Sequence, residues 1–138
     1  MKGPAWPYPR VLAHRGGGKL APENTLAAIR FGASLGFKGV EFDVMLAGDG
    51  TPVLIHDQTL ARTAGSVAHV ATTPYREIAE LDAGRWRGRK WRGERIPTFE
   101  QAARLCRDLG LWVNVDIKPA AGYERRTGEA VARLAREL

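Results

Sequence analysis

The sequence predicts an α/β fold in which parallel strands alternate with helices that cover them. Apolar runs typical of strands occur at residues 10–14, 39–46 and 111–117, and a segment with apolar residues at helical spacing follows each of them. Repeated strand–helix units form a parallel sheet with helices packed on it. The chain has 138 residues, 44% hydrophobic and 26% charged, which is an ordinary composition for one soluble globular domain with its own core.

The first strand–helix unit begins with residues 10–14, which lead into a loop of three consecutive glycines. Pro22-Glu23-Asn24 precedes the expected helix, and Gly36 is expected to end it. The inward face of this helix carries Leu26, Ile29 and Ala33.

The second strand, residues 39–46, is followed by a turn and a further strand over residues 52–56. A connection this short cannot carry a parallel crossover, so the two strands form an antiparallel hairpin. A two-residue turn in either possible register places His56 opposite Asp43 or Glu41, on the face that both carboxylates share. A three-residue loop would break this pairing.

Residues 60–72 show no clear periodicity and are expected to form a loop. Thr73-Pro74 has the residue types of a helix N-cap and first helical position. A short helix with Ile78 and Leu81 facing inward is therefore expected to follow it.

The last elements have clearer signals. Thr98-Phe99-Glu100-Gln101 has the spacing of a capping box, so it begins a helix that Gly110 ends. Residues 111–117 form the third strand, in which polar and apolar residues alternate. Residues 123–138 form a final amphipathic helix along Val131, Leu134 and Leu138.

The net charge of +6 is concentrated in one segment. Residues 84–95 hold six basic residues and one acidic residue, so they carry +5 of it, with Trp86 and Trp91 interleaved. Basic and aromatic residues together can track a nucleic-acid strand. The alternative is a solvated basic loop beside a site for an anionic substrate, and on that interpretation no nucleic-acid partner is expected.

The sequence indicates a cytoplasmic protein. No window approaches the ~18 to 20 apolar residues of a membrane span, and the first ten residues lack the apolar core of a signal peptide. Cys106 is the single cysteine and cannot form an internal disulfide, which agrees with a reducing compartment.

Carboxylates interrupt two of the predicted strands. Glu41 and Asp43 lie on one face of the second strand, and Asp116 comes from the third. Charged groups inside strands are costly unless they are paired or bind metal. Three convergent carboxylates suit a hard divalent cation, Mg²⁺ or Ca²⁺. The alternative is that Glu41 and Asp43 form ion pairs with Arg15 and Lys118.

Two histidines end strands near these carboxylates. His14 and His56 can act as an acid–base pair because imidazole titrates near neutral pH, although a histidine of this kind can also be a hydrogen-bonded structural residue. His69 lies in the irregular segment and has no such context. Arg15 and Lys118 are natural phosphate ligands.

These residues belong to an ordered set of short motifs that resembles the glycerophosphodiester phosphodiesterase family. The motifs extend from about residue 11 to residue 119 and are His14-Arg15-Gly16, Pro22-Glu23-Asn24-Thr25, Glu41-Phe42-Asp43, His56-Asp57, Ile96-Pro97-Thr98 and Asp116-Ile117-Lys118. The resemblance implies a TIM (β/α)8 barrel and metal-dependent hydrolysis of glycerophosphodiesters to glycerol 3-phosphate and an alcohol.

The resemblance also implies a role for each candidate residue. His14 and His56 would be the catalytic acid–base pair, Arg15 and Lys118 would contact phosphate, and the metal ligands would be Glu41, Asp43 and Asp116. The family usually has Glu at the third ligand position, so Asp116 is one methylene shorter. Residues 1–138 would be a partial catalytic domain, in which about 47–95 form an insertion between strand two and helix two.

Length sets one further expectation. A TIM barrel takes about 250 residues, and three strands cannot close one. We therefore expect either a missing carboxyl-terminal half or a homodimer in which two chains shield each other's open edges. Two alternative functions remain open, a phospholipase C-like phosphodiesterase and an inactive half-barrel that binds phosphodiesters or a partner chain.

Overall fold

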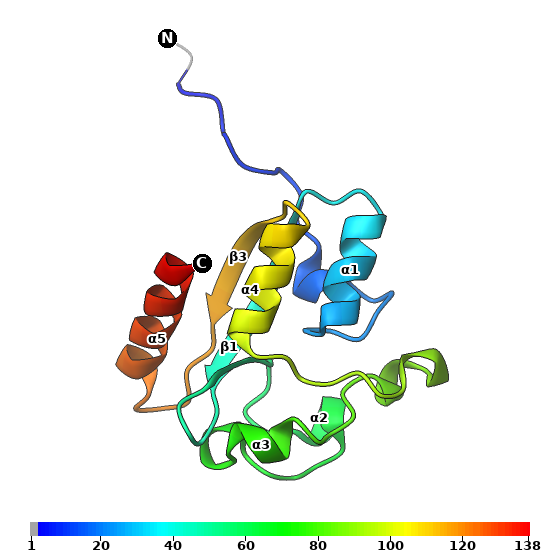
Figure 1. Ribbon diagram of the computed structural model, residues 1–138, viewed down its shortest axis with the longest axis vertical. Coiled ribbons are helices and arrows are strands. Elements are labelled where there is room, and N and C mark those ends of the chain that lie inside the picture. The colour runs from blue at the N-terminus through cyan, green and yellow to red at the C-terminus, as the bar shows by residue number, and fades with distance from the viewer. Residues whose placement is uncertain (1–2) are drawn as a thin grey trace.

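The computed structural model describes residues 3–138 and contains one three-stranded sheet in the order β2-β1-β3 (Figure 1). β1 pairs in parallel with β3 and antiparallel with β2. The strands and helices in chain order are α1 (Leu26–Ser34), β1 (Gly39–Leu46), β2 (Pro52–Leu54), α2 (Ala61–Ala64), α3 (Tyr75–Ile78), α4 (Phe99–Asp108), β3 (Trp112–Ile117) and α5 (Glu124–Glu137). Short 3-10 turns occur at His14–Gly16, Val70–Thr72, Arg85–Arg87 and Arg89–Trp91.

The alternation of side chains along β1 and β3 separates a core face from a polar face. Val40, Phe42 and Val44 of β1 belong to the main hydrophobic core, and Val113 and Val115 of β3 pack against it. In the parallel register, Glu41 lies beside Asn114 and Asp43 beside Asp116. Because successive side chains in a strand point to opposite faces, these polar residues gather on the face away from the core.

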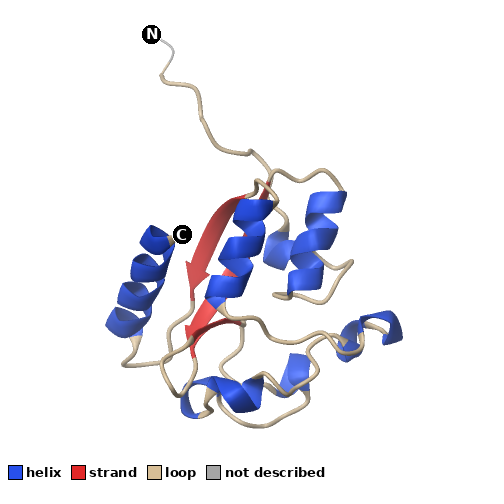
Figure 2. Cartoon of the chain, in the orientation of Figure 1, coloured by secondary structure: helices blue, strands red, loops and turns tan. Residues whose placement is uncertain are grey.

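The helices α1, α4 and α5 contribute Ile29, Ala102 and Val131 to this core, and Figure 2 shows these helices beside the sheet. The ring of Phe42 on β1 meets that of Phe99 on α4 edge to face, with centroids 6.1 Å apart. The capping box predicted for α4 is confirmed in both directions: Thr98 Oγ1 accepts the Gln101 N–H, and the Gln101 side chain accepts the Thr98 N–H. The predicted helices 123–138 and 98–110 and the strands 39–46 and 111–117 are thus present, with small shifts at their ends.

The strand predicted over residues 10–14 is wrong. Ala13 alone forms a bridge, to Val40 of β1, and His14 already begins a 3-10 turn. The hydrogen bonds from the Ala13 N–H to Gly39 O and from the Glu41 N–H to Ala13 O hold this residue beside β1. Val11 is exposed, so the apolar pattern that predicted the strand has no packing partner here.

The register predicted for the hairpin is also wrong. Leu46 pairs with Pro52 and Val44 with Leu54, and the Ala47 N–H donates to Thr51 O, so residues 48–50 form a three-residue loop and not a two-residue turn. Gly50 adopts φ 84°, which lets its N–H reach Ala47 O at 2.9 Å. Neither predicted pairing of His56 forms, and regular strand geometry ends at Leu54.

The segment from residue 60 to residue 96 forms a smaller second core beyond the carboxyl end of β1. Residues 60–72, predicted as a loop, contain α2 and a 3-10 turn, and the short helix expected after Thr73-Pro74 begins one residue later, at Tyr75. Leu60, Val70 and Ile78 are fully buried against Met45 at the end of β1. Among the described residues, no helix is both long and apolar enough to cross a membrane.

Candidate active site

An open cavity of about 360 Å³ lies at the carboxyl ends of β1 and β3. Parallel α/β sheets carry their binding sites at this end of the strands. All seven candidate residues predicted from the sequence line it: His14, Arg15, Glu41, Asp43, His56, Asp116 and Lys118, together with Asn114 and Val115. The structure therefore brings the predicted set together, although the strand and the hairpin register that were expected to position the two histidines are wrong.

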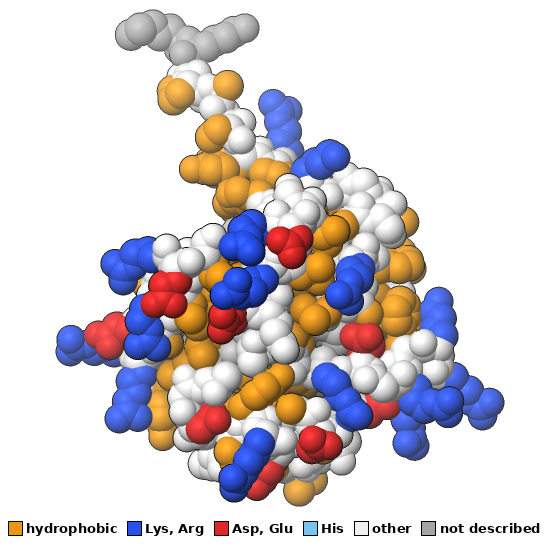
Figure 3. Space-filling model, viewed as in Figure 1, with side chains coloured by type: hydrophobic (Ala, Val, Ile, Leu, Met, Phe, Trp, Pro, Cys, Tyr) orange, Lys and Arg blue, Asp and Glu red, His pale blue; other side chains and the backbone are white. Residues whose placement is uncertain are grey.

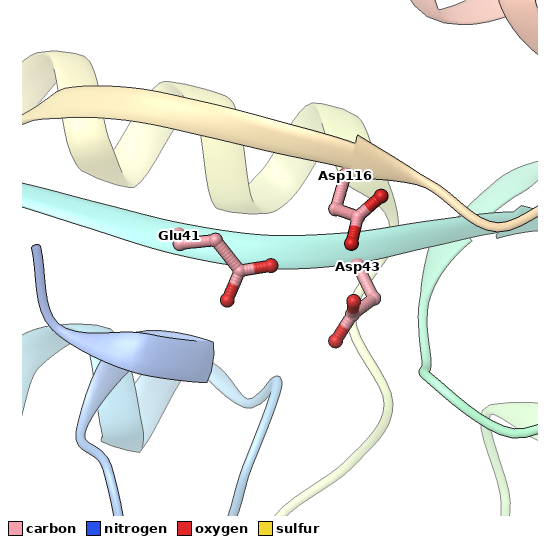
Figure 4. Close-up of side chains that lie close together, drawn as sticks. All are labelled: Glu41, Asp43 and Asp116. Atoms are coloured by element: carbon pink, nitrogen blue, oxygen red, sulfur yellow. The ribbon is translucent and has the colours of Figure 1, made fainter.

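Three carboxylates form the acidic corner of this cavity. Glu41 and Asp43 come from β1 and Asp116 from β3 (Figure 4), and each offers an oxygen within 4.8 Å of the other two. Burial, together with the neighbouring charges of Asp43 and Asp116, raises the pKa of Glu41. An all-oxygen donor set with repelling charges is the kind of site that a hard divalent cation fits.

Asp43 is the most tightly held of the three carboxylates. Its Oδ2 accepts a hydrogen bond from Asn24 Nδ2 at 3.0 Å, and its own N–H donates to Asn24 Oδ1 at 3.2 Å. The Arg15 Nε lies 3.5 Å from the same Oδ2. The alternative of ion pairing is therefore realised in part, for Asp43 with Arg15. Lys118 instead pairs with Asp116, with 3.1 Å between Nζ and Oδ2.

The turn that carries Arg15 is strained and closely packed. Arg15 and Asn24 both have positive φ, 52° and 58°, which non-glycine residues seldom adopt. The Asn24 N–H donates to Arg15 O at 2.9 Å, which ties the two residues together. A Cβ at Gly32 of α1 would lie 2.1 Å from Gly16 O, so the close approach of α1 to this turn requires glycine there. Such strain is typical of functional sites.

Arg15 also contacts two glutamates, Glu41 and Glu23. Its backbone N–H donates to Glu41 Oε2 at 3.1 Å, and its Nη1 donates to Glu23 Oε2 at 3.0 Å. The Nε of Arg15 is buried and has no hydrogen-bond partner among the described residues. A buried donor of this kind on the cavity wall is suited to an oxyanion ligand.

His56 is held by a chain of charged residues behind the cavity. Its Nδ1 lies 2.8 Å from Asp57 Oδ1, and Arg62 donates from Nε to Asp57 Oδ2 at 2.9 Å. Arg62 also donates to both oxygens of Glu23, at 2.6 Å and 3.0 Å, and Glu23 in turn holds Arg15. One network thus connects the histidine to the arginine.

The charges in this network alter the pKa values of its members. The hydrogen bonds and charge of Arg62 lower the pKa of Asp57 to about 2. Burial alone would raise the pKa of Glu23, but Arg62 and Arg15 lower it overall. Asp57 is therefore ionised and favours the tautomer in which the His56 Nδ1 carries a proton, which leaves Nε2 free to exchange one.

His14 is held much more loosely. Its side chain is 69% exposed, against 34% for His56, and its Nε2 lies 3.8 Å from Glu41 Oε2.

The hydrogen bond and charge of Asp116 raise the pKa of Lys118, so this side chain is a cation at neutral pH. The cavity therefore contains two imidazoles, two cations and three carboxylates.

Three network residues were not among the predicted site residues. Glu23 and Asp57 belong to the motifs recognised in the sequence, but no role was predicted for them. Arg62 lies in the segment predicted as a loop, and its single signal was a long basic side chain between small residues.

The sequence from residue 14 to residue 138 matches the Glycerophosphoryl diester phosphodiesterase family. A glycerophosphodiester phosphodiesterase of Caldanaerobacter subterraneus subsp. tengcongensis is 45% identical over 108 residues, which are 78% of this chain and 44% of that protein. Glycerophosphodiester phosphodiesterase 1 of Homo sapiens is 38% identical over 130 residues, 93% of this chain and 38% of the relative.

Solved structures give the same result. A phosphodiesterase of Oleispira antarctica in complex with the product sn-glycerol-3-phosphate superposes with a TM-score of 0.91 at 41% identity, over 94% of this chain and 53% of that one. The glycerophosphodiester phosphodiesterase of Thermotoga maritima gives 0.73 at 29% identity, over 91% and 49%.

The chain belongs to the glycerophosphoryl diester phosphodiesterase family. The recognition from sequence motifs and the predicted fold class, part of a TIM barrel, are both confirmed. The chain spans 44% and 38% of the length of the two relatives described above.

Proposed function

We propose that this chain supplies the catalytic residues for hydrolysis of glycerophosphodiesters to glycerol 3-phosphate and an alcohol. The observation that carries the proposal is the single cavity that holds both histidines, both cations and the three carboxylates. The product complex of the Oleispira relative supports the substrate class. In this proposal residues 47–95 are an insertion that brings His56 to the cavity.

Glu41, Asp43 and Asp116 would hold a divalent cation, Mg²⁺ or Ca²⁺. Such a cation neutralises phosphoryl charge and lowers the pKa of an oxygen nucleophile. The fit is supported by the three oxygens within 4.8 Å and by the raised pKa of Glu41, because a cation would offset the burial cost and the repulsion that raise it.

Arg15 and Lys118 would bind the phosphodiester. The Nε of Arg15, which lacks a hydrogen-bond partner among the described residues, and the ammonium of Lys118 belong to residues that line the same cavity as the carboxylates. A phosphodiester carries one negative charge, which increases at the non-bridging oxygens as the nucleophile adds. Fixed cations stabilise that developing charge more strongly than they stabilise the ground state.

His14 and His56 would move the protons. One imidazole takes the proton of the attacking oxygen as the new P–O bond forms. The other gives a proton to the alcohol oxygen as its bond to phosphorus breaks, so that neither oxygen carries a full charge. His56, with Nδ1 on Asp57, offers its Nε2 for one of these transfers.

The test is an assay for glycerol 3-phosphate released from glycerophosphocholine, on this chain and on any longer product of the same gene. We expect release with Mg²⁺ or Ca²⁺, loss of release with chelator, and loss in His56→Ala. The matched control is Asp108→Asn, an exposed carboxylate at the end of α4 outside the cavity. Release that persists in chelator at the full rate would contradict the metal-dependent proposal.

A further inference from the structure

The +5 segment between α3 and α4 presents cations that the protein itself leaves uncompensated. We call its six basic residues the basic rim: Arg85, Arg87, Arg89, Lys90, Arg92 and Arg95. Figure 3 shows Lys and Arg side chains gathered at the edge of the molecule where Figure 1 draws this segment. Within the part of the chain that the structure describes, no carboxylate forms an ion pair with any of the six, although Arg15, Arg62, Arg104 and Arg125 all have such partners.

The acidic residues near the basic rim accept backbone N–H groups and form no ion pair with it among the described residues. Asp82 accepts three backbone N–H groups, those of Gly84 and Arg85 at 2.9 Å and 2.8 Å and that of Gly93 at 2.8 Å. Glu94 accepts the Ala27 N–H at the start of α1 at 3.4 Å. Carboxylates thus hold the backbone at both ends of the segment. Its basic side chains are left without ion-pair partners among the described residues.

Exposed apolar side chains accompany the basic rim. Trp86, which lies between Arg85 and Arg87, is 40% exposed, and its indole N–H donates to Ala83 O, which satisfies its one polar group. Leu20 is 61% exposed in the loop that the rim contacts, because Arg87 Nη2 donates to Lys19 O. Val67 is 88% exposed. It lies two residues after Gly65, and Gly65 lines the same cavity as Trp86.

This surface adjoins the candidate active site. The guanidinium of Arg62 lies 5.8 Å from the centroid of the Trp86 ring. The same guanidinium holds Asp57, and Asp57 holds His56. Arg87, through Lys19, contacts the loop that follows Arg15. The segment that carries the basic rim is therefore connected to His56 through Trp86, Arg62 and Asp57, and to the loop after Arg15 through Lys19.

We infer that the basic rim, with Trp86, Leu20 and Val67, docks this protein on a bilayer surface that contains anionic lipids. Juxtaposed cations and exposed Trp and aliphatic side chains are the chemistry of interfacial binding, in which cations meet headgroups and apolar side chains enter the headgroup boundary. Docking through this surface would hold the cavity mouth close to phosphodiesters at the membrane.

A nucleic-acid strand fits this surface less well. Binding of single strands relies on open aromatic faces on which bases stack. Here Arg62 and Arg87 lie within 5.9 Å of the Trp86 ring centroid, and Trp91 packs edge to face on Phe31 with Lys90 over its ring. The stacking faces are thus occupied, and Leu20 and Val67 would have no role in following a phosphate backbone.

The test measures binding of this chain to vesicles, which needs no catalytic activity and so separates this inference from the proposed hydrolysis. Vesicles of phosphatidylcholine alone are compared with vesicles of phosphatidylcholine mixed with phosphatidylglycerol. The rim variant replaces Arg85, Arg89, Lys90 and Arg92 with Gln, because none of these side chains donates a described hydrogen bond. The matched control replaces four exposed arginines of α5 with Gln and so has the same net charge as the rim variant. These arginines are Arg125, Arg126, Arg133 and Arg136.

We expect the unaltered chain to bind the anionic vesicles, and the rim variant to bind them about a hundredfold more weakly, since each cation near an anionic surface contributes to the affinity. The α5 variant should stay within about threefold of the unaltered chain, and Leu20→Ser with Val67→Ser should weaken binding without changing net charge. Circular dichroism checks that each variant is folded.

Three results would overturn the inference. The first is no preference of the unaltered chain for anionic vesicles. The second is an equal loss in the rim and α5 variants, which would show that net charge alone is responsible. The third is tighter, rim-dependent binding to a single-stranded oligonucleotide than to the vesicles, which would assign this surface to nucleic acid.

Discussion

The two halves of the cavity are built very differently. On one half, Asp43, Arg15 and His56 are each fixed by hydrogen bonds to other residues, and we call these three the pinned half. On the other, His14 and Asp116 are exposed or half-exposed, and Asp116 has Lys118 as its ion-pair partner. We call His14, Asp116 and Lys118 the open half.

For the two carboxylates, the difference follows from the strands that carry them, β1 for Asp43 and β3 for Asp116. β1 is hydrogen-bonded on both sides and buried along nearly its whole length, whereas β3 is paired on one side and half-exposed. Folding alone sets the geometry of the pinned half. The open half has fewer restraints, so we expect a bound cation and phosphate to complete its geometry.

The largest expected effect comes from the histidines, one on each half. His14→Ala and His56→Ala should each lower turnover by about 10² to 10⁴, because each removes a proton-transfer group. The double variant should be little worse than either single variant, since groups that act as a unit are not additive. Steady-state kinetics measures this, with His69→Ala as the control because His69 lies outside the cavity. Near-normal turnover in either single variant would remove that residue from the mechanism.

The network behind His56 should have the next largest effect. Asp57→Asn should lower turnover by roughly tenfold or more, because groups that orient a functional histidine have effects of this size. The ¹⁵N chemical shifts of the imidazole provide a second measurement. In the unaltered chain they should show a proton on Nδ1 of His56, and in Asp57→Asn a mixture of tautomers. An unchanged tautomer together with reduced turnover would mean that Asp57 acts in some other way.

Lengthening an aspartate by one methylene group, to glutamate, should have different effects in the pinned half and the open half. Asp43→Glu should lower cation affinity by roughly tenfold or more and destabilise the fold by about 1 to 3 kcal/mol, because the longer side chain does not fit the buried contact with Asn24. Asp116→Glu should stay within about threefold in cation affinity, since the half-exposed side chain can adjust. Equal effects at the two positions would contradict the distinction between the halves.

The smallest expected effect is on stability. The pKa of Glu41 is raised above its ordinary value of 4.5, so the folded chain binds this proton more tightly than the unfolded chain. Stability therefore falls as pH rises through the interval between the two pKa values and stays lower at neutral pH. Glu41→Gln should raise the melting temperature in chelator at neutral pH, whereas Glu77→Gln, at an exposed position of α3, should not. A lower melting temperature for Glu41→Gln would show that its carboxylate is stabilising.

The sequence predicted the elements whose signals are local and strong. The capping box at Thr98 and Gln101 and the alternation of Val113 and Val115 with Asn114 and Asp116 determined α4 and β3. The acidic residues of the cavity could be found because charged residues in a buried strand are costly, so Glu41 and Asp43 stood out. Each of these signals depends on residues that are close in the sequence or that share one face of a strand.

The features that the sequence did not predict depend on contacts between distant residues. The hairpin loop is held by the Gly48 N–H, which donates to Thr73 O at 2.8 Å, and the apolar run at residues 10–14 does not form a strand because Ala13 alone reaches β1. Arg62 was missed because its partners, Glu23 and Asp57, come together only in the folded chain, 39 and 5 residues away in sequence.

The central claim is that the acidic corner is a divalent-cation site, and isothermal titration calorimetry with Mg²⁺ and with Ca²⁺ tests it most directly. We expect a single binding event in the unaltered chain and in the Asp108→Asn control. In Asp43→Asn, which keeps the size of the side chain but removes its charge, that event should be lost or greatly weakened while circular dichroism shows a folded chain. Unchanged cation affinity in Asp43→Asn would contradict the account.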